Sequence, residues 1–251
     1  MKTLTGNSRR REQRIQSALL DRLALTTFSR IRTEVRRGML DIFERGAVAE
    51  AEHNRRISAI LNRTWTASAR PFVDRVLDGV PQEKRVVPIF RTEVMDGVVA
   101  RWIATTGGNK ITEITETTKA DINRVLAGAT RDGLGEREAA KLVKQVALSK
   151  SFSRARTIAR TETHAAANVA TQGAAELAGA QLGIQFKRVW VAALDDRTRD
   201  SASDHRAADG QQRGMTEPFS VSGELLMQPG DPSGSPGNVI NCRCAVVYEP
   251  A

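Results

Sequence analysis

The segment from Trp190 to Cys244 constrains the fold most strongly, because it is long, polar and rich in glycine, yet apolar runs flank it. The run FKRVWVAA, residues 186–193, and the run AVVY, residues 245–248, have the alternating or β-branched character of strands. Acidic side chains, arginines and a histidine crowd the residues between them. Residues 195–198, DDRT, have the composition of a turn, in which an aspartate bonds to the backbone two residues on. Buried charge requires a partner, so we expect an ordered loop that is either a self-bonded structural element or a functional site.

An alanine-rich stretch, residues 152–180, precedes this loop and predicts the central helix of the carboxy-terminal half. Small side chains let another backbone approach closely. Arg156 and Arg160 are four residues apart and share a helix face, where a guanidinium group can bind a loop carboxylate with two hydrogen bonds. The expected partners are Asp195, Asp196 and Asp209. We interpret this pairing as structural.

Helical periodicity also dominates the amino-terminal half. Residues 1–12 are predicted to fray, and apolar spacing from Gln13 to Met39 predicts one long helix or two that meet near Thr26. We expect Gly46 to end this amino-terminal helical stretch. Further helices are expected at residues 47–61, 71–77, 82–104 (interrupted by Pro88), 114–129 and 136–148. A break at Gly107–Asn109 predicts a domain boundary, with a basic helical region at 1–109 and a second domain at 110–251. The fold class expected is α+β and mainly helical, with a small sheet and a long ordered loop.

Positive charge is concentrated near the amino terminus. The chain carries a formal net charge of +9, and residues 1–70 hold 15 Lys and Arg against 7 Asp and Glu. Clustered arginine is typical of surfaces that meet phosphate backbones or acidic partners, although it is also typical of a solvated helix face. The candidate phosphate or partner contacts are Arg9, Arg10, Arg11, Arg14, Arg36 and Arg37.

Several classes of protein are disfavoured by what the sequence lacks. No apolar run approaches the roughly 20 residues of a membrane span, and the basic start is not followed by the apolar stretch of a secretory signal. Two cysteines separated by one residue do not predict a disulfide framework. We therefore expect synthesis in the cytoplasm.

The loop residues suggest two kinds of chemistry. His205, Cys242 and Cys244 offer zinc-ligand atoms, with His164 as a fourth candidate, but Cys-x-Cys is tighter than the usual spacing. Packed thiols are the favoured interpretation, and no metal or other cofactor is predicted. No nucleophile elbow or glycine-rich phosphate loop occurs, so no catalytic residue is predicted.

Six blocks carry a resemblance to a known family: ARTIARTETHAAAN, VWVAALDDRTRDS, HRAADGQ, PF, PGDPSG and VINCRC. In this order and spacing they resemble the carboxy-terminal domain of phage Mu F-like minor head proteins, over about residues 110–248. The chain departs from the family pattern at residues 239–241, where VIN replaces HPN. Twelve residues form the structural motif expected to fasten the loop to the alanine-rich helix: Arg160, Glu162, Asp195, Arg197, Thr198, His205, Asp209, Gly210, Asn241, Cys242, Arg243 and Cys244.

The resemblance implies a virion component that assembles at the portal of a tailed phage head, in several copies, and without catalytic turnover. Its implied partners are the portal protein, the major capsid protein and packaged DNA, with a further role in DNA delivery; no membrane partner is implied. Two alternatives stay open. One is a DNA-binding protein that acts through the basic amino-terminal helices, and the other is an enzyme that uses the region of Arg160, Glu162 and His205.

Overall fold

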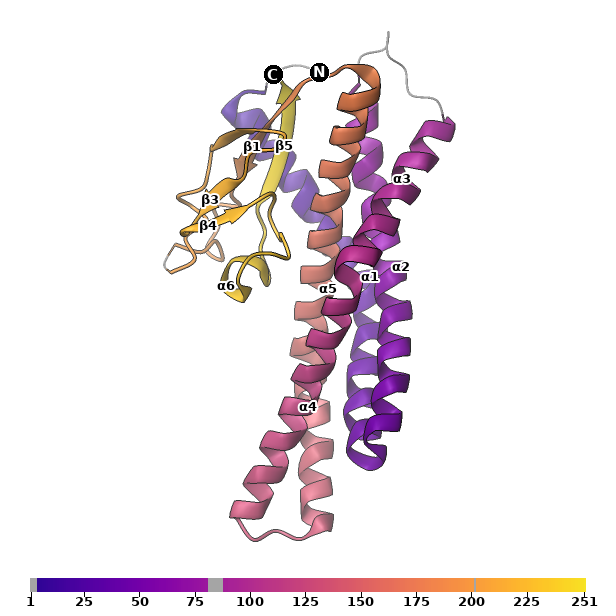
Figure 1. The fold of residues 1–251 in the computed structure, drawn as a ribbon. Helices are drawn as coiled ribbons and strands as arrows, with labels where there is room; N and C mark the ends of the chain where they lie inside the picture. Colours follow the sequence, from indigo (N-terminus) through magenta and orange to yellow (C-terminus); the bar gives the residue numbers. More distant parts are fainter. Residues whose placement is uncertain (1–3, 81–87, 201) are drawn as a thin grey trace. The chain divides into compact units, whose positions relative to one another are not determined.

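Long helices make up most of the chain, and two small antiparallel sheets follow them (Figure 1). The computed structural model describes residues 4–80, 88–200 and 202–251. The helices are α1 (Gly6–Arg45), α2 (Ala47–Asp78), α3 (Pro88–Trp102), the π-helical turn η2 (Ile103–Gly107), α4 (Gly108–Arg131), α5 (Glu136–Leu182) and the short α6 (Pro236–Val239). This confirms the predicted α+β, mainly helical class.

The strands cluster at the carboxy-terminal end of the chain. They are β1 (Phe186–Val191), β2 (Gln212–Gly214), β3 (Phe219–Val221), β4 (Glu224–Leu226) and β5 (Ala245–Pro250). The first sheet has the order β2-β1-β5, and β3 pairs with β4 in the second. Strand β1 pairs along its length with β5, with Trp190 opposite Val246. The two strands predicted from the sequence are therefore neighbours in one sheet, and the loop between them leaves from and returns to that sheet.

The helix boundaries correct several predictions. Gly46, at φ 59°, separates α1 from α2 as predicted. The first twelve residues do not fray throughout, because α1 begins at Gly6. The predicted breaks within residues 47–78, at Gly107–Asn109 and at residues 149–153 are absent from the described chain, where α2, η2–α4 and α5 continue through them. Residues 82–87 of the predicted 82–104 helix lie outside the described residues.

The chain forms two compact units, each built from segments that are distant in sequence. Unit 1 contains residues 1–23, 64–102 and 160–251, and unit 2 contains residues 24–63 and 103–159. Helices α1, α2 and α5 therefore each contribute residues to both units. The domain boundary expected after residue 109 stays a prediction.

Unit 1 has a core in which small alanines face large aromatics. Ala170, Ala174 and Ala178 of α5 are buried in one cluster with Trp190 and Phe219. Gly173 lies so close to α3 that a Cβ at this position would approach Val98 Cγ2 at 2.7 Å. The alanine-rich stretch thus acts as predicted, because its missing side-chain volume admits both a neighbouring helix and the sheet.

Unit 2 packs four helical segments around aliphatic side chains and buried ion pairs. Ile42 of α1, Ile122 of α4 and Val143 of α5 belong to one apolar cluster. His53 Nδ1 lies 2.7 Å from Glu34 Oε1, and both side chains are buried. In the described residues of both units, no helix combines the length and apolar character of a membrane span.

Candidate functional site

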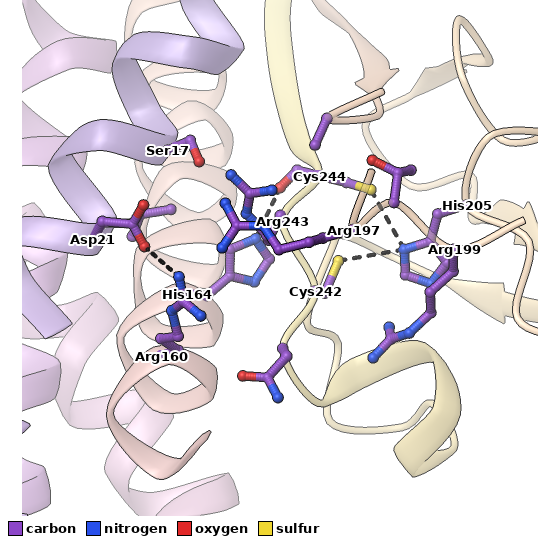
Figure 2. A pocket seen from close by; sticks show the side chains of 14 residues that line it. Ser17, Asp21, Arg160, His164, Arg197, Arg199, His205, Cys242, Arg243 and Cys244 are labelled. Carbon is purple, nitrogen blue, oxygen red and sulfur yellow. Dashed lines mark hydrogen bonds and ion pairs between the residues drawn. The ribbon is translucent and has the colours of Figure 1, made fainter. Parts of the chain in front are cut away.

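A cavity of about 240 Å³ lies in unit 1, where α1, α5 and the long loop meet. Figure 2 shows the side chains that surround it. Its lining residues are Ser17, Leu20 and Asp21 of α1, Arg160 and His164 of α5, and Ala193, Arg197, Thr198, Arg199, His205, Asn241, Cys242, Arg243 and Cys244. Eight of the twelve predicted motif residues therefore share one cavity.

Asp195 organises the first turn of the loop. Its Oδ1 accepts hydrogen bonds from the Arg197 backbone N–H at 3.1 Å and from Thr198 Oγ1 at 3.2 Å. The first of these is the turn chemistry predicted from the sequence. Its other oxygen, Oδ2, pairs with Arg243. Burial raises the pKa of Asp195, but the hydrogen bonds from Arg243 and the Arg197 N–H outweigh it, so that the pKa lies below its ordinary value.

Asp209 fastens the middle of the loop to β1 and α1. Its Oδ1 accepts from the Ala192 N–H at 2.9 Å, and both its oxygens accept from Arg10, at 3.0 and 2.5 Å. Gly210 follows with φ 78°, a conformation that favours glycine, and its N–H donates to the Trp190 carbonyl at 2.8 Å. Both residues thus make structural contacts, but their described contacts are with α1 and the end of β1 and not with the alanine-rich helix.

Arg160 does not bind a loop carboxylate, contrary to our prediction. Its Nη2 lies 3.2 Å from Oδ1 of Asp21 on α1, as the dashed line in Figure 2 shows. Asp195 and Asp209 pair instead with Arg243 and Arg10. The prediction was wrong because residues 1–12 were expected to fray. Arg10 was therefore not expected to compete with the arginines of α5 for Asp209.

Glu162 has a described partner on another helix. It is buried and accepts a hydrogen bond from Trp65 Nε1 of α2 at 3.1 Å. We expected Glu162 to fasten the loop to α5, but two neighbouring residues of α5 do so. Thr161 Oγ1 accepts from the Asn241 N–H at 3.1 Å, and His164 Nε2 lies 2.8 Å from the Cys244 carbonyl oxygen. The loop is thus fastened to α5 as predicted, but through Thr161 and His164.

Sequence reasoning missed Arg188 of β1, whose fully buried guanidinium group donates to the carbonyls of Gly214, Met227 and Glu217. Burial lowers its pKa, and nearby Tyr248 and glutamates only partly offset this. Gln172 of α5 bridges Arg188 Nη1 and the Tyr248 hydroxyl. The sequence does contain an indication of this. Arg188 is two residues before Trp190 in β1, so both side chains lie on the same, inward face of the strand.

The amino-terminal arginines have mixed surroundings. Arg9 binds Glu249 of β5 through two hydrogen bonds, of 2.5 and 2.8 Å, which raise the pKa of Arg9. Arg37 pairs with Asp41 one turn along α1. The ion pairs found among the described residues include none with Arg11, Arg14 or Arg36, which are exposed. Phosphate contact by the six predicted arginines stays a prediction.

His205 and the two cysteines form a compact buried cluster. His205 Nδ1 lies 3.6 Å from Cys242 Sγ and 3.4 Å from Cys244 Sγ. A hydrogen bond between the thiols holds the pKa of Cys242 well below its ordinary value despite burial, and raises that of Cys244. Both cysteines are free thiols. The spacing argument against a shared site did not anticipate the turn at Asn241, φ 56°, that precedes them.

Comparison with known proteins identifies the family. The family described as phage Mu protein F like protein matches residues 120–247, about half of the chain. The chain belongs to the phage Mu protein F-like family. This confirms the family resemblance inferred from the sequence. The matched region contains the whole loop and every cavity-lining residue from Arg160 to Cys244.

Two relatives of this Mu F-like chain are informative. Minor head protein GP7 of Bacillus phage SPP1 is 37% identical over 99 residues, which are 39% of this chain and 30% of that protein. A protein of Enterococcus faecalis named NAD(+)--arginine ADP-ribosyltransferase EFV is 34% identical over 97 residues, which are 39% of this chain and 19% of that protein. The chain thus spans less than a third of either relative. No solved structure matches it significantly.

Proposed function

We propose that this Mu F-like protein is a minor head protein of a tailed bacteriophage, which assembles at the portal vertex and contacts the portal protein. The observation that carries the proposal is the family match over residues 120–247 together with the relative named as a minor head protein. These support a place in the virion, which is also the location expected from the sequence. Contacts with the major capsid protein, several copies around the portal, and a role in DNA packaging or delivery belong to the same proposal.

The chemistry of the loop supports a role in assembly. Its carboxylates are engaged by Arg243 and Arg10, and its backbone by Thr161 and His164. Groups that are already bonded to each other hold a rigid surface, and are not free to bind and release a substrate. We therefore propose that the motif residues maintain the shape of a docking module without turnover.

Localisation in the virion tests this proposal. An epitope-tagged chain is supplied to a phage that lacks its own copy, and the tag is labelled with gold in purified heads. We expect label at a single vertex and cross-links to the portal protein. Label spread over the whole capsid, or heads that complete assembly without the protein, would contradict a portal role.

The basic residues support a second, separable candidate: contact with packaged DNA. Deleting residues 1–70 is a poor test, because Arg9 and Arg10 are part of unit 1. Replacing Arg11, Arg14 and Arg36 with Gln removes exposed charge without a described ion pair. The matched control replaces three exposed cations outside this region: Arg131, Arg137 and Lys144.

DNA binding through the basic helices predicts that log Kd depends linearly on log salt concentration, with a slope of about 0.9 per neutralised phosphate. The variant of Arg11, Arg14 and Arg36 should lose up to about three phosphate contacts, and its slope should fall accordingly. The control variant should keep the wild-type slope. Equal slopes for both variants would reject contact through these arginines.

An enzyme remains the rival class, because one relative carries the name of an ADP-ribosyltransferase. We propose that this chain has no such activity. The purified chain is incubated with labelled NAD and an arginine-rich acceptor protein, and no label should be transferred. Transfer that disappears in a folded Arg160→Ala variant would overturn the proposal and assign Arg160 to catalysis.

A further inference from the structure

The buried cluster of His205, Cys242 and Cys244 has the composition of a transition-metal site. A nitrogen and two sulfurs lie within 4.8 Å of one another, all on buried side chains. We propose that these three residues bind one zinc-type divalent cation, through Nδ1 of His205 and Sγ of both cysteines. This inference is independent of the role proposed above.

Distances within the cluster agree with tetrahedral coordination. Zinc lies about 2.3 Å from sulfur and about 2.0 Å from nitrogen, so a tetrahedral site sets its nitrogen and sulfur ligands about 3.5 Å apart. The two distances from His205 Nδ1 to the sulfurs are 3.6 and 3.4 Å. The cation therefore fits between the three atoms with little movement of the side chains, which Figure 2 shows converging from two parts of the loop.

The tautomer of His205 is set for ligation. Its Nε2 lies 3.2 Å from Oδ1 of Asn238. The Asn238 amide is oriented by its own nitrogen, which donates to the Val221 carbonyl at 3.4 Å, so that its oxygen must face His205. His205 accordingly carries its proton on Nε2, which leaves the Nδ1 lone pair free for the metal. Metal-binding histidines commonly have such a second hydrogen bond, which orients the ring.

The fourth coordination position faces the cavity. His205, Cys242 and Cys244 all line it, together with the guanidinium groups of Arg160, Arg197, Arg199 and Arg243. His164 is not assigned as the fourth ligand, because among the described residues the group of ligand atoms within 4.8 Å of one another contains His205, Cys242 and Cys244 but not His164. Its Nδ1 lies beside Gly230 instead. We assign the fourth position to a water molecule or small anion, which the surrounding arginines favour. Both sulfurs bind the cation as thiolates, so any proton that a thiol still carries is released when the cation binds.

Cobalt substitution tests the proposal on the full-length chain. The protein is purified in a phosphine reductant, stripped of metal by a chelator and titrated with Co²⁺. We expect one cobalt per chain, an intense visible absorption typical of tetrahedral geometry, and a sulfur-to-cobalt charge-transfer band. The charge-transfer band reports thiolate ligation directly and does not depend on any variant being folded. Saturation without this band would overturn the proposal.

Matched variants locate the ligands. Cys242→Ser, Cys244→Ser and His205→Gln should each lose at least 100-fold in cobalt affinity. His53→Gln is the control, because it removes a buried histidine that does not line the cavity and should keep the affinity. Asn238→Ala should weaken binding by about 10- to 100-fold, as expected for loss of the group that orients a ligand. Equal affinity of the wild type and a folded Cys242→Ser/Cys244→Ser double variant would reject the site.

Oxidation is the competing fate of two adjacent thiols. Intact-mass measurement of the chain as isolated, without reductant, distinguishes the two states. A zinc site predicts one bound zinc in native spectra and the full mass of two thiols after denaturation. A Cys242–Cys244 disulfide with no bound metal would lower the mass by two hydrogens, and would overturn the proposal in favour of a redox pair.

Discussion

Arg10 and Asp209 form a bidentate ion pair between residues separated by 199 positions in the chain. The same guanidinium group donates to the Ala192 carbonyl, and the same carboxylate accepts from the Ala192 N–H. Three segments are therefore joined at one point: the first turns of α1, the end of β1 and the middle of the long loop. The amino-terminal charge that suggests a nucleic-acid surface is used in part to hold the fold.

This relationship predicts that Arg10→Ala destabilises unit 1 by about 1 kcal/mol, since the pair is half-exposed but has ideal two-point geometry. Arg10→Lys should recover less than half of the loss, because an ammonium group cannot make both bonds. Arg11→Ala, which removes an exposed neighbour, is the control. Urea unfolding followed by tryptophan fluorescence measures the change, and Trp65, Trp102 and Trp190 all lie in unit 1. Equal stability of all three variants would refute the structural role.

The sequence was sufficient to locate several elements but not their partners. Periodicity located α1, β1 and β5, and turn chemistry correctly predicted the hydrogen bond of Asp195 with the backbone of Arg197. Those bonds are local. The partner of Arg160 depends on which helix turn lies opposite it, and this is a tertiary fact that a pattern within one helix does not contain.

Local sequence features also did not predict that the long helices are continuous. Pro71, the glycines at 107 and 108 and the serines at 149–153 each favour a helix end, and each lies within or between continuous helical segments. Burial against other helices offsets the weak local penalties, as at Ser151, which is 1% exposed. Placing a helix boundary at every such residue therefore overestimates the number of helices in a chain of this kind.

A second prediction concerns Arg188. Arg188→Met should destabilise the chain by about 3 kcal/mol, because it leaves the buried carbonyls of Gly214 and Met227 without donors. Arg188→Lys should also destabilise, since one ammonium group cannot reach the same set of acceptors. Lys187→Met changes the neighbouring residue of β1, whose side chain is partly exposed, and should alter stability by less than about 1 kcal/mol. A neutral Arg188→Met variant would show that the carbonyls find other partners.

A third prediction concerns acid stability through Asp121 in unit 2. Burial raises the pKa of this carboxyl, but hydrogen bonds from Arg124 and Lys150 and the charge of Arg154 outweigh it, so that the pKa is lowered from 3.8. A carboxyl with a lowered folded-state pKa stabilises the fold at pH values above 3.8, and this contribution is lost as pH falls through the lowered value. The chain should therefore lose stability in this acidic window.

Asp121→Asn removes this dependence. The variant should be less stable than the wild type at pH 7, and the difference in unfolding free energy should shrink as pH falls below 3.8, the ordinary value for Asp. Asp132→Asn, at an exposed turn after α4, is the control. Urea unfolding followed by circular dichroism at several pH values measures the effect. A difference between wild type and Asp121→Asn that stays constant with pH would contradict it.

The last prediction uses the close approach of α5 to α3. A Cβ at Gly173 would lie 2.7 Å from Val98 Cγ2, whereas a Cβ at Gly97 would meet nothing within 4 Å. Gly173→Ala should therefore destabilise unit 1 by about 1–3 kcal/mol through overpacking, while Gly97→Ala should stabilise it by up to about 1 kcal/mol, because alanine favours helix. The same substitution thus has opposite signs on two facing helices. Val98→Ala removes the clashing methyl groups, so the Gly173→Ala/Val98→Ala double variant should be more stable than the sum of the single effects predicts. Strict additivity in that cycle, measured by thermal unfolding, would show that the two helices are not in contact at this point.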